Sequence, residues 1–213
     1  MPKPSKRSIV RPPAVRTRRA YFDCQFGQLH VRTAFPTTGG FDERVTLFCL
    51  HPAGGSSRLF SQFLPLMADD RSVYAPDLPG SGESDPPATP GLAQAAAAVS
   101  GLASDLRLRQ VDVLGFLDGC LVAMELAHSR PELVRRLVLI GLPAHQGLPV
   151  VKQPSLVLRL GAGGAPGVNG AARSGTHASG SLPRAEYRDA SDFAADLFVA
   201  APQSLANQLR AYL

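Results

Sequence analysis

The chain has 213 residues, of which 45 % are apolar and 18 % charged, as expected for one globular domain. No apolar run reaches the roughly 18 residues that a membrane-spanning helix needs, so we expect no membrane span. Three widely separated cysteines, Cys24, Cys49 and Cys120, argue against a disulfide framework and a zinc site. They fit a reduced, cytoplasmic setting, and no metal is expected.

The net charge of +5 comes from the N-terminal segment. Residues 1–19 hold seven basic and no acidic residues, whereas the rest of the chain holds 15 basic and 17 acidic ones. We therefore predict a basic, disordered tail over residues 1–19 and one domain over residues 20–213. Nucleic acid would have to bind through the tail alone, so no specific nucleic-acid partner is expected.

Strand and helix patterns alternate along the domain. It opens with an expected hairpin, whose strands at 21–24 and 28–33 flank a Gln-Phe-Gly turn. Short apolar runs predict buried strands at 45–50, 72–76, 111–114, 137–140 and 155–160, with a last strand at 185–189. Helical patterns cover 59–67, 92–106, 121–128 and 193–213, the last interrupted at Pro202. Residues 161–182 are rich in glycine and are expected to be irregular. This alternation predicts an α/β fold with a parallel sheet.

Three of these strands run directly into loops of distinctive sequence. The first loop reads HPAGG (51–55), the second DLPGSG (77–82) and the third GFLDG (115–119). In this order they resemble the α/β-hydrolase superfamily, in its lipase/esterase-like and haloperoxidase-like branch. The resemblance implies a mostly parallel sheet flanked by helices, here shortened, and it implies no cofactor.

The third loop corresponds to the nucleophile elbow of that family, G-x-S-x-G. There the nucleophile sits on a tight, strained strand-to-helix turn that needs small residues two positions before and after it. Gly115 and Gly119 meet this need, but the residue between them is Leu117, which cannot attack a carbonyl. A frame shifted by one would make Asp118 the nucleophile, as in haloalkane dehalogenases and epoxide hydrolases. It would also place Phe116 where a small residue is required, so we interpret Asp118 as a helix N-terminal carboxylate.

The other two triad positions are altered as well. By resemblance, Ala195 stands where the general-base histidine would be, and no carboxylate follows the strand at 155–160. His145, which follows the strand at 137–140, is the candidate for a replacement base. Residues 141–154 are too few for the helical cap that relatives carry at this point. The top of the sheet is therefore expected to be open, and a small apolar ligand or a protein partner could cover it.

The oxyanion hole needs backbone rather than side chains and can survive these replacements. The resemblance implies that the N–H groups of Ala53 and Asp118 form it, with His51 as a structural or a substrate-facing member of the same loop. Two readings follow. The chain is either a non-catalytic or relic homologue that acts as a binding module, or a hydrolase of a small ester, epoxide or haloalkane that uses Asp118 and His145.

Overall fold

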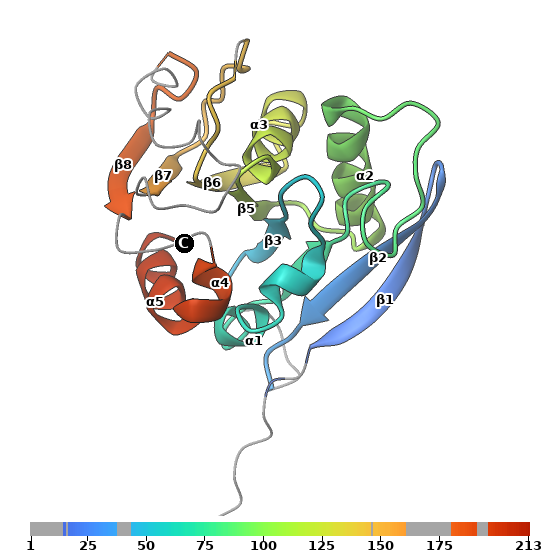
Figure 1. Ribbon diagram of the computed structural model, residues 1–213, viewed down its shortest axis with the longest axis horizontal. Coiled ribbons are helices and arrows are strands. Elements are labelled where there is room, and N and C mark those ends of the chain that lie inside the picture. The colour runs from blue at the N-terminus through green and yellow to red at the C-terminus, as the bar shows by residue number, and fades with distance from the viewer. Residues whose placement is uncertain (1–14, 16, 38–43, 146, 161–179, 191–195) are drawn as a thin grey trace, which may run out of the picture.

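An eight-stranded sheet organises the computed structural model, which describes residues 15, 17–37, 44–145, 147–160, 180–190 and 196–213 (Figure 1). The strand order is β1-β2-β4-β3-β5-β6-β7-β8. The strands are β1 Arg18–Cys24, β2 Gly27–Ala34, β3 Thr46–Leu50, β4 Val73–Pro76, β5 Val111–Phe116, β6 Val134–Ile140, β7 Ser155–Leu160 and β8 Ala185–Ala190. The helices are a 3₁₀ turn Ser57–Phe60, α1 Leu64–Met67, α2 Leu92–Asp105, α3 Gly119–Ser129, α4 Leu197–Ala200 and α5 Pro202–Tyr212.

The sheet is parallel from β4 to β8 and antiparallel only at one side. The β1–β2 hairpin is antiparallel, and β2 is antiparallel to β4. All other neighbours are parallel. Every residue of β3, β4 and β5 is buried, because helices cover both faces of the sheet, and this explains their continuous apolar sequences. The predicted α/β class and the five predicted parallel strands are confirmed.

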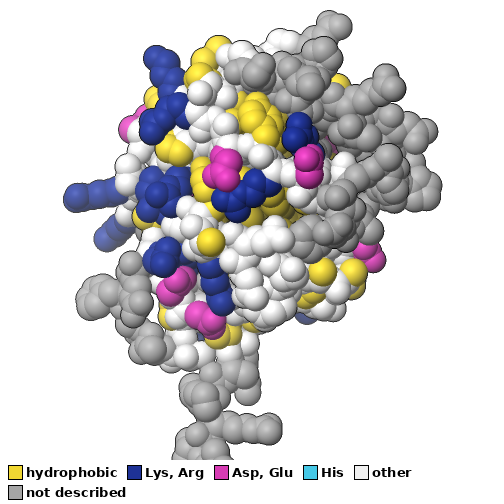
Figure 2. Space-filling model, turned by 90° about the vertical axis from the view of Figure 1, so that its left-hand side faces the viewer, with side chains coloured by type: hydrophobic (Ala, Val, Ile, Leu, Met, Phe, Trp, Pro, Cys, Tyr) yellow, Lys and Arg dark blue, Asp and Glu magenta, His cyan; other side chains and the backbone are white. Residues whose placement is uncertain are grey.

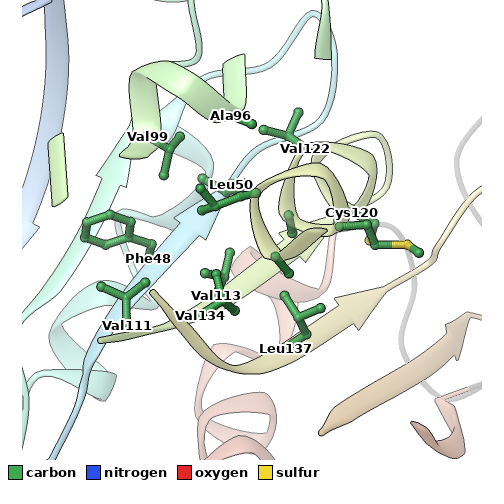
Figure 3. Packing of buried hydrophobic residues seen from close by; sticks show 14 of the residues in the cluster. Phe48, Leu50, Ala96, Val99, Val111, Val113, Cys120, Val122, Val134 and Leu137 are labelled. Atoms are coloured by element: carbon green, nitrogen blue, oxygen red, sulfur yellow. The ribbon is translucent and has the colours of Figure 1, made fainter. Parts of the chain in front are cut away.

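Alternate side chains of each strand enter separate cores on the two faces. Phe48 and Leu50 of β3 pack on one side with residues of α2 and α3, as Figure 3 shows. Leu47 and Cys49 point to the other side, where α1, α4 and α5 lie. Because the two cores share every central strand, the strands are held firmly and their ends become fixed points for the loops.

Charged groups are buried near the amino ends of β5 and β6. Asp112 is fully buried and accepts two hydrogen bonds from Arg135, at 2.9 and 2.5 Å. The fully buried Arg71 adds a second cation at 3.6 Å. Burial raises the pKa of Asp112, and the arginines oppose that shift. Arg135 and Arg136 also donate to backbone oxygens at the end of α5, so this cluster holds α5 to the sheet.

Several predicted boundaries differ from the structure. β1 begins at Arg18, so the last two residues assigned to the tail pair with β2. The predicted helix at 59–67 is a 3₁₀ turn followed by the one-turn α1. The closing helix divides into α4 and α5 next to Pro202, as expected. Most of the tail and residues 161–179 of the glycine-rich segment lie outside the described residues. Within the segment's described end, Leu182 is buried in the core.

Phe198 of α4 should be a main anchor of the second core. It is fully buried and makes edge-on contacts with Phe60, Phe63 and Phe116, with ring centroids 4.8, 5.2 and 5.1 Å away. Phe198→Ala should lower the free energy of unfolding by about 3–5 kcal/mol in urea titrations. The neighbouring Val199 is 53 % exposed, so Val199→Ala should change it by less than about 0.5 kcal/mol. Equal effects of the two substitutions would contradict this packing.

Candidate functional site

The turn between β5 and α3 has the backbone of a nucleophile elbow. Leu117 adopts φ 49°, in the left-handed region, which costs residues other than glycine roughly 1–2 kcal/mol. A Cβ on Gly115 would lie 2.6 Å from Cys120 Cα, and one on Gly119 would lie 2.3 Å from the Leu50 carbonyl oxygen. Both glycines are therefore required for the backbone to pass so closely, and the strained position falls on Leu117.

The Leu117 side chain is held by packing rather than by hydrogen bonds. A Cβ on Gly141 would lie 2.8 Å from Leu117 Cδ2 and 2.9 Å from Leu160 Cδ1, so both side chains lie beside this glycine. Leu117 is half-buried and packs against the core that contains Phe116 and Phe198. An aliphatic group thus occupies the point at which the family carries its nucleophile.

Asp118 follows the strained residue and occupies the N-cap position of α3. Its φ of −61° and ψ of −25° are helical, and its side chain makes no capping hydrogen bond. As a helix N-terminal carboxylate, Asp118 is therefore stabilised by the helix dipole and not by hydrogen bonds from the helix N–H groups. The carboxylate is exposed.

His51 joins the loops that follow β3 and β4. Its Nε2 accepts a hydrogen bond from the Leu78 N–H at 2.8 Å, so Nδ1 carries the proton and donates to the Pro52 carbonyl at 2.8 Å. Burial lowers the pKa of this histidine, which favours the neutral ring. Both ring nitrogens are thus used within the protein, and this geometry favours the structural interpretation of His51 over the substrate-facing one.

Two unpaired backbone donors lie in the loops that follow β3 and β5. Pro52 to Gly55 form a turn in which Gly55 N–H donates to the Pro52 carbonyl and Gly54 has φ 70°, features of a type II turn. Within the described part of the chain, neither the Ala53 nor the Asp118 N–H donates to a protein acceptor. Strands β3 and β5 pair at their carboxyl ends, which brings their two loops together.

Asp77 braces the loop after β4. Its buried carboxylate accepts hydrogen bonds from the Ser57 N–H at 2.6 Å, from the Glu83 N–H at 2.9 Å and from His30 Nδ1 at 2.9 Å. Burial acts to raise the pKa of Asp77, but the hydrogen bonds outweigh it and the pKa lies below its usual range. The partner His30 lies 47 residues away on β2, and no local sequence signal indicated this pair.

Within the described part of the chain, no hydrogen bond or ion pair joins His145 to the elbow. His145 is exposed on the connection between β6 and β7, whose described residues, 141–145 and 147–154, contain no helix or strand. Ala195 lies outside the described residues, as does most of the segment after β7. Among the described residues there is no cluster of three or more possible metal ligands and no helix long and apolar enough to span a membrane.

The sheet has the strand order β1-β2-β4-β3-β5-β6-β7-β8, and the elbow lies between β5 and α3. Residues 45–208 match the alpha/beta hydrolase fold family. This chain belongs to that family. The match extends from β3 into α5 and so includes the elbow and the loops after β3 and β4.

Individual relatives cover less of the sequence than the fold does. An uncharacterized protein of Mycobacterium tuberculosis is 33 % identical over 138 residues, which is 64 % of this chain and 38 % of that protein. Pyrrolizixenacetamide deacetylase of Xenorhabdus hominickii is 35 % identical over 97 residues, 45 % of this chain and 36 % of that enzyme. The chain thus matches well under half the length of these relatives.

Solved structures agree with the fold over nearly the whole chain. Naproxen esterase from Bacillus subtilis superimposes with a TM-score of 0.77 at 18 % identity, over 93 % of this chain and 92 % of that one. A predicted CIB-like hydrolase from Thermoplasma acidophilum gives 0.79 at 15 % identity, over 93 % and 98 %. At these identities the likeness concerns the fold alone.

The buried Asp77 should make the protein sensitive to acid. Because its pKa is lower when folded than when unfolded, the carboxylate contributes stability above about pH 4. This contribution is lost as the pH falls through the folded-state pKa. Asp77→Asn should lower the free energy of unfolding at pH 7 and flatten its decline toward pH ~3, measured by urea titration at each pH. Parallel pH profiles for the variant and the wild type would contradict the role of this carboxylate.

Proposed function

We propose that this protein is a non-catalytic or relic member of the alpha/beta hydrolase fold family and that it acts as a binding module. The observation that carries the proposal is Leu117 in the strained elbow position, at φ 49°. In a hydrolase this backbone strain exposes a nucleophile, whereas here it presents an aliphatic side chain packed against the second core. No proton transfer gives that side chain nucleophilic character.

The features that remain suit a small, largely apolar ligand with one oxygen acceptor. The free N–H groups of Ala53 and Asp118 can donate to a carbonyl or carboxylate oxygen. The start of α3, an eleven-residue helix, favours negative charge at the same place. The half-buried Leu117 offers apolar surface beside it. The connection at 141–154 lacks room for a helical cap, so a protein partner over the open rim also fits the proposal.

We propose that this module is a single domain over residues 20–213 and that it lies in the cytoplasm. The three cysteines are unpaired, as a reducing compartment would keep them. Cys49 and Cys120 are buried, and burial raises the pKa of both thiols, so neither is an activated nucleophile.

The alternative is a hydrolase that uses Asp118 with His145 and the retained oxyanion donors. The observation in its favour is that the Asp118 carboxylate is exposed and makes no capping hydrogen bond. Two observations count against it. The left-handed backbone falls on Leu117 rather than on Asp118. The shifted frame also needs a small residue two positions before Asp118, and that position holds Phe116, which is packed against Phe198. We therefore favour the non-catalytic proposal.

The wild-type chain should not react with a fluorophosphonate probe, which labels serines that are activated by a base and an oxyanion hole. Leu117→Ser should also stay nearly unlabelled, because its hydroxyl would lack a histidine at the position of Ala195. Labelling is measured by in-gel fluorescence, with an active serine esterase as the positive control. Strong labelling of Leu117→Ser would show that a base survives and would overturn the proposed loss of the triad.

Asp118→Asn separates the two functional proposals. We expect the wild type to show no turnover of short esters, epoxides or haloalkanes above the uncatalysed rate, and the variant to behave identically. If the wild type turns over any of these substrates, and Asp118→Asn abolishes the activity at an unchanged melting temperature, Asp118 is the nucleophile. The non-catalytic proposal would then be wrong.

Removal of the Ala53 N–H should abolish ligand binding without unfolding the loop. Proline suits the second position of a type II turn, and the Ala53 N–H makes no protein hydrogen bond, so Ala53→Pro should keep the wild-type melting temperature. Butyrate, a carboxylate with a short apolar chain, should raise the melting temperature of the wild type but not of Ala53→Pro. Equal shifts for both would place the carboxylate elsewhere.

A further inference from the structure

β8 leaves one edge of the sheet open within the described part of the chain. It is the last strand of the sheet and pairs only with β7. Its charged side chains extend into solvent, with Glu186 53 %, Arg188 41 % and Asp189 71 % exposed. Figure 2 looks at the side of the molecule on which β8 lies and shows basic and acidic side chains close together there. An open edge of this kind can pair with another strand.

The β7 register decides which backbone groups of β8 point outward. Ser155 N–H donates to the Arg184 carbonyl, and Ser155 lies opposite Ala185. Because the bonds of a parallel ladder alternate along each strand, the backbone groups of Glu186 and Arg188 face β7. Those of Ala185, Tyr187 and Asp189 face away from it. The Ala185 N–H is already used, since it donates to the Leu182 carbonyl, but the Tyr187 and Asp189 N–H groups are directed outward.

A second copy of β8 can meet this edge in antiparallel orientation about a two-fold axis. Outward groups meet only if the axis passes through a residue, which leaves three central registers, on Glu186, Tyr187 or Arg188. An axis at Glu186 would set that carboxylate against its own copy, and an axis at Arg188 would do the same with the guanidinium. Like charges directly opposite each other destabilise a strand pair.

An axis at Tyr187 places opposite charges across from each other. Glu186 then faces Arg188 of the second copy and Arg188 faces Glu186, at a non-hydrogen-bonded pair, where side chains approach most closely. Within each chain the same two residues already form an ion pair at 2.6 Å. The two pairs would therefore join into a square of alternating charges. Tyr187 would exchange both backbone bonds with its counterpart, and each Asp189 N–H would reach the Ala185 carbonyl of the second copy.

The other face of the strand is compatible with the same register. Arg159 of β7 lies over the Tyr187 ring, 6.0 Å from its centroid, and is 2.9 Å from Asp189. The two Tyr187 rings would become cross-strand neighbours, each covered by its own Arg159. Ala185 would lie opposite Asp189, so no bulky side chain obstructs the approach.

We propose that β8 is a homodimer interface, in which two copies of this chain pair antiparallel about an axis at Tyr187. The sheet then runs continuously through both copies. The surface is independent of the ligand site proposed at the elbow, since it uses the edge of the sheet and not the loops after β3 and β5.

Sedimentation equilibrium of the full chain at low ionic strength tests the proposal. The wild type should associate to a dimer, and the dissociation constant should rise with salt because the charges are partly exposed. Glu186→Arg and Arg188→Glu, each alone, replace opposite charges by like charges at both symmetric pairs. Each should weaken dimerisation about tenfold or more. Melting temperatures by circular dichroism identify any variant that fails to fold.

Two complementary experiments distinguish pairing from a general loss of stability. The double variant Glu186→Arg/Arg188→Glu restores the opposite charges and should dimerise like the wild type. A mixture of the two single variants should form a heterodimer, since two arginines of one chain then face two glutamates of the other. Native mass spectrometry resolves it. A monomeric wild type would overturn the proposal. A dimer that neither single reversal weakens would also overturn it, because such a dimer would use another interface. So would a mixture of the two single variants that forms no heterodimer.

Discussion

The close approach of backbone at the end of β5 is the constraint on which the rest of the site depends. Gly115 and Gly119 lie within 3 Å of neighbouring backbone atoms, counted from where a Cβ would stand. This contact fixes the start of α3 against the end of β3 and forces the residue between the glycines into the left-handed region. The strain is therefore a property of the architecture and persists with a leucine in that position.

Loops around the elbow are interlocked by buried polar groups that serve structure. His51 connects the loop after β3 to the loop after β4, and Asp77 connects the latter to β2 and to the 3₁₀ turn. Each of these bonds uses a donor or an acceptor whose burial alone would be costly. This explains why the loop framework of a hydrolase can be kept when its nucleophile is not, because the framework also satisfies the fold.

The Leu117 side chain shows how the same backbone can support a different chemistry. It packs against the second core and extends that core toward the carboxyl ends of the strands. Burial of this apolar surface offsets part of the cost of the left-handed backbone. A serine at this position would lose that contact, so the leucine also contributes to stability in its present setting.

By itself, the sequence determined the fold class, the five parallel strands and the frame of the elbow. Continuous apolar runs, turn residues and the spacing of Gly115 and Gly119 are local features, and each has a local physical cause. Only the tertiary structure decided the pairing of His30 with Asp77, the use of both nitrogens of His51 and the missing cap bond of Asp118. These depend on which groups meet across the sheet, over separations such as the 47 residues between His30 and Asp77. Which backbone groups of β8 face outward was likewise set by its register with β7, because a strand's own sequence does not fix its neighbour.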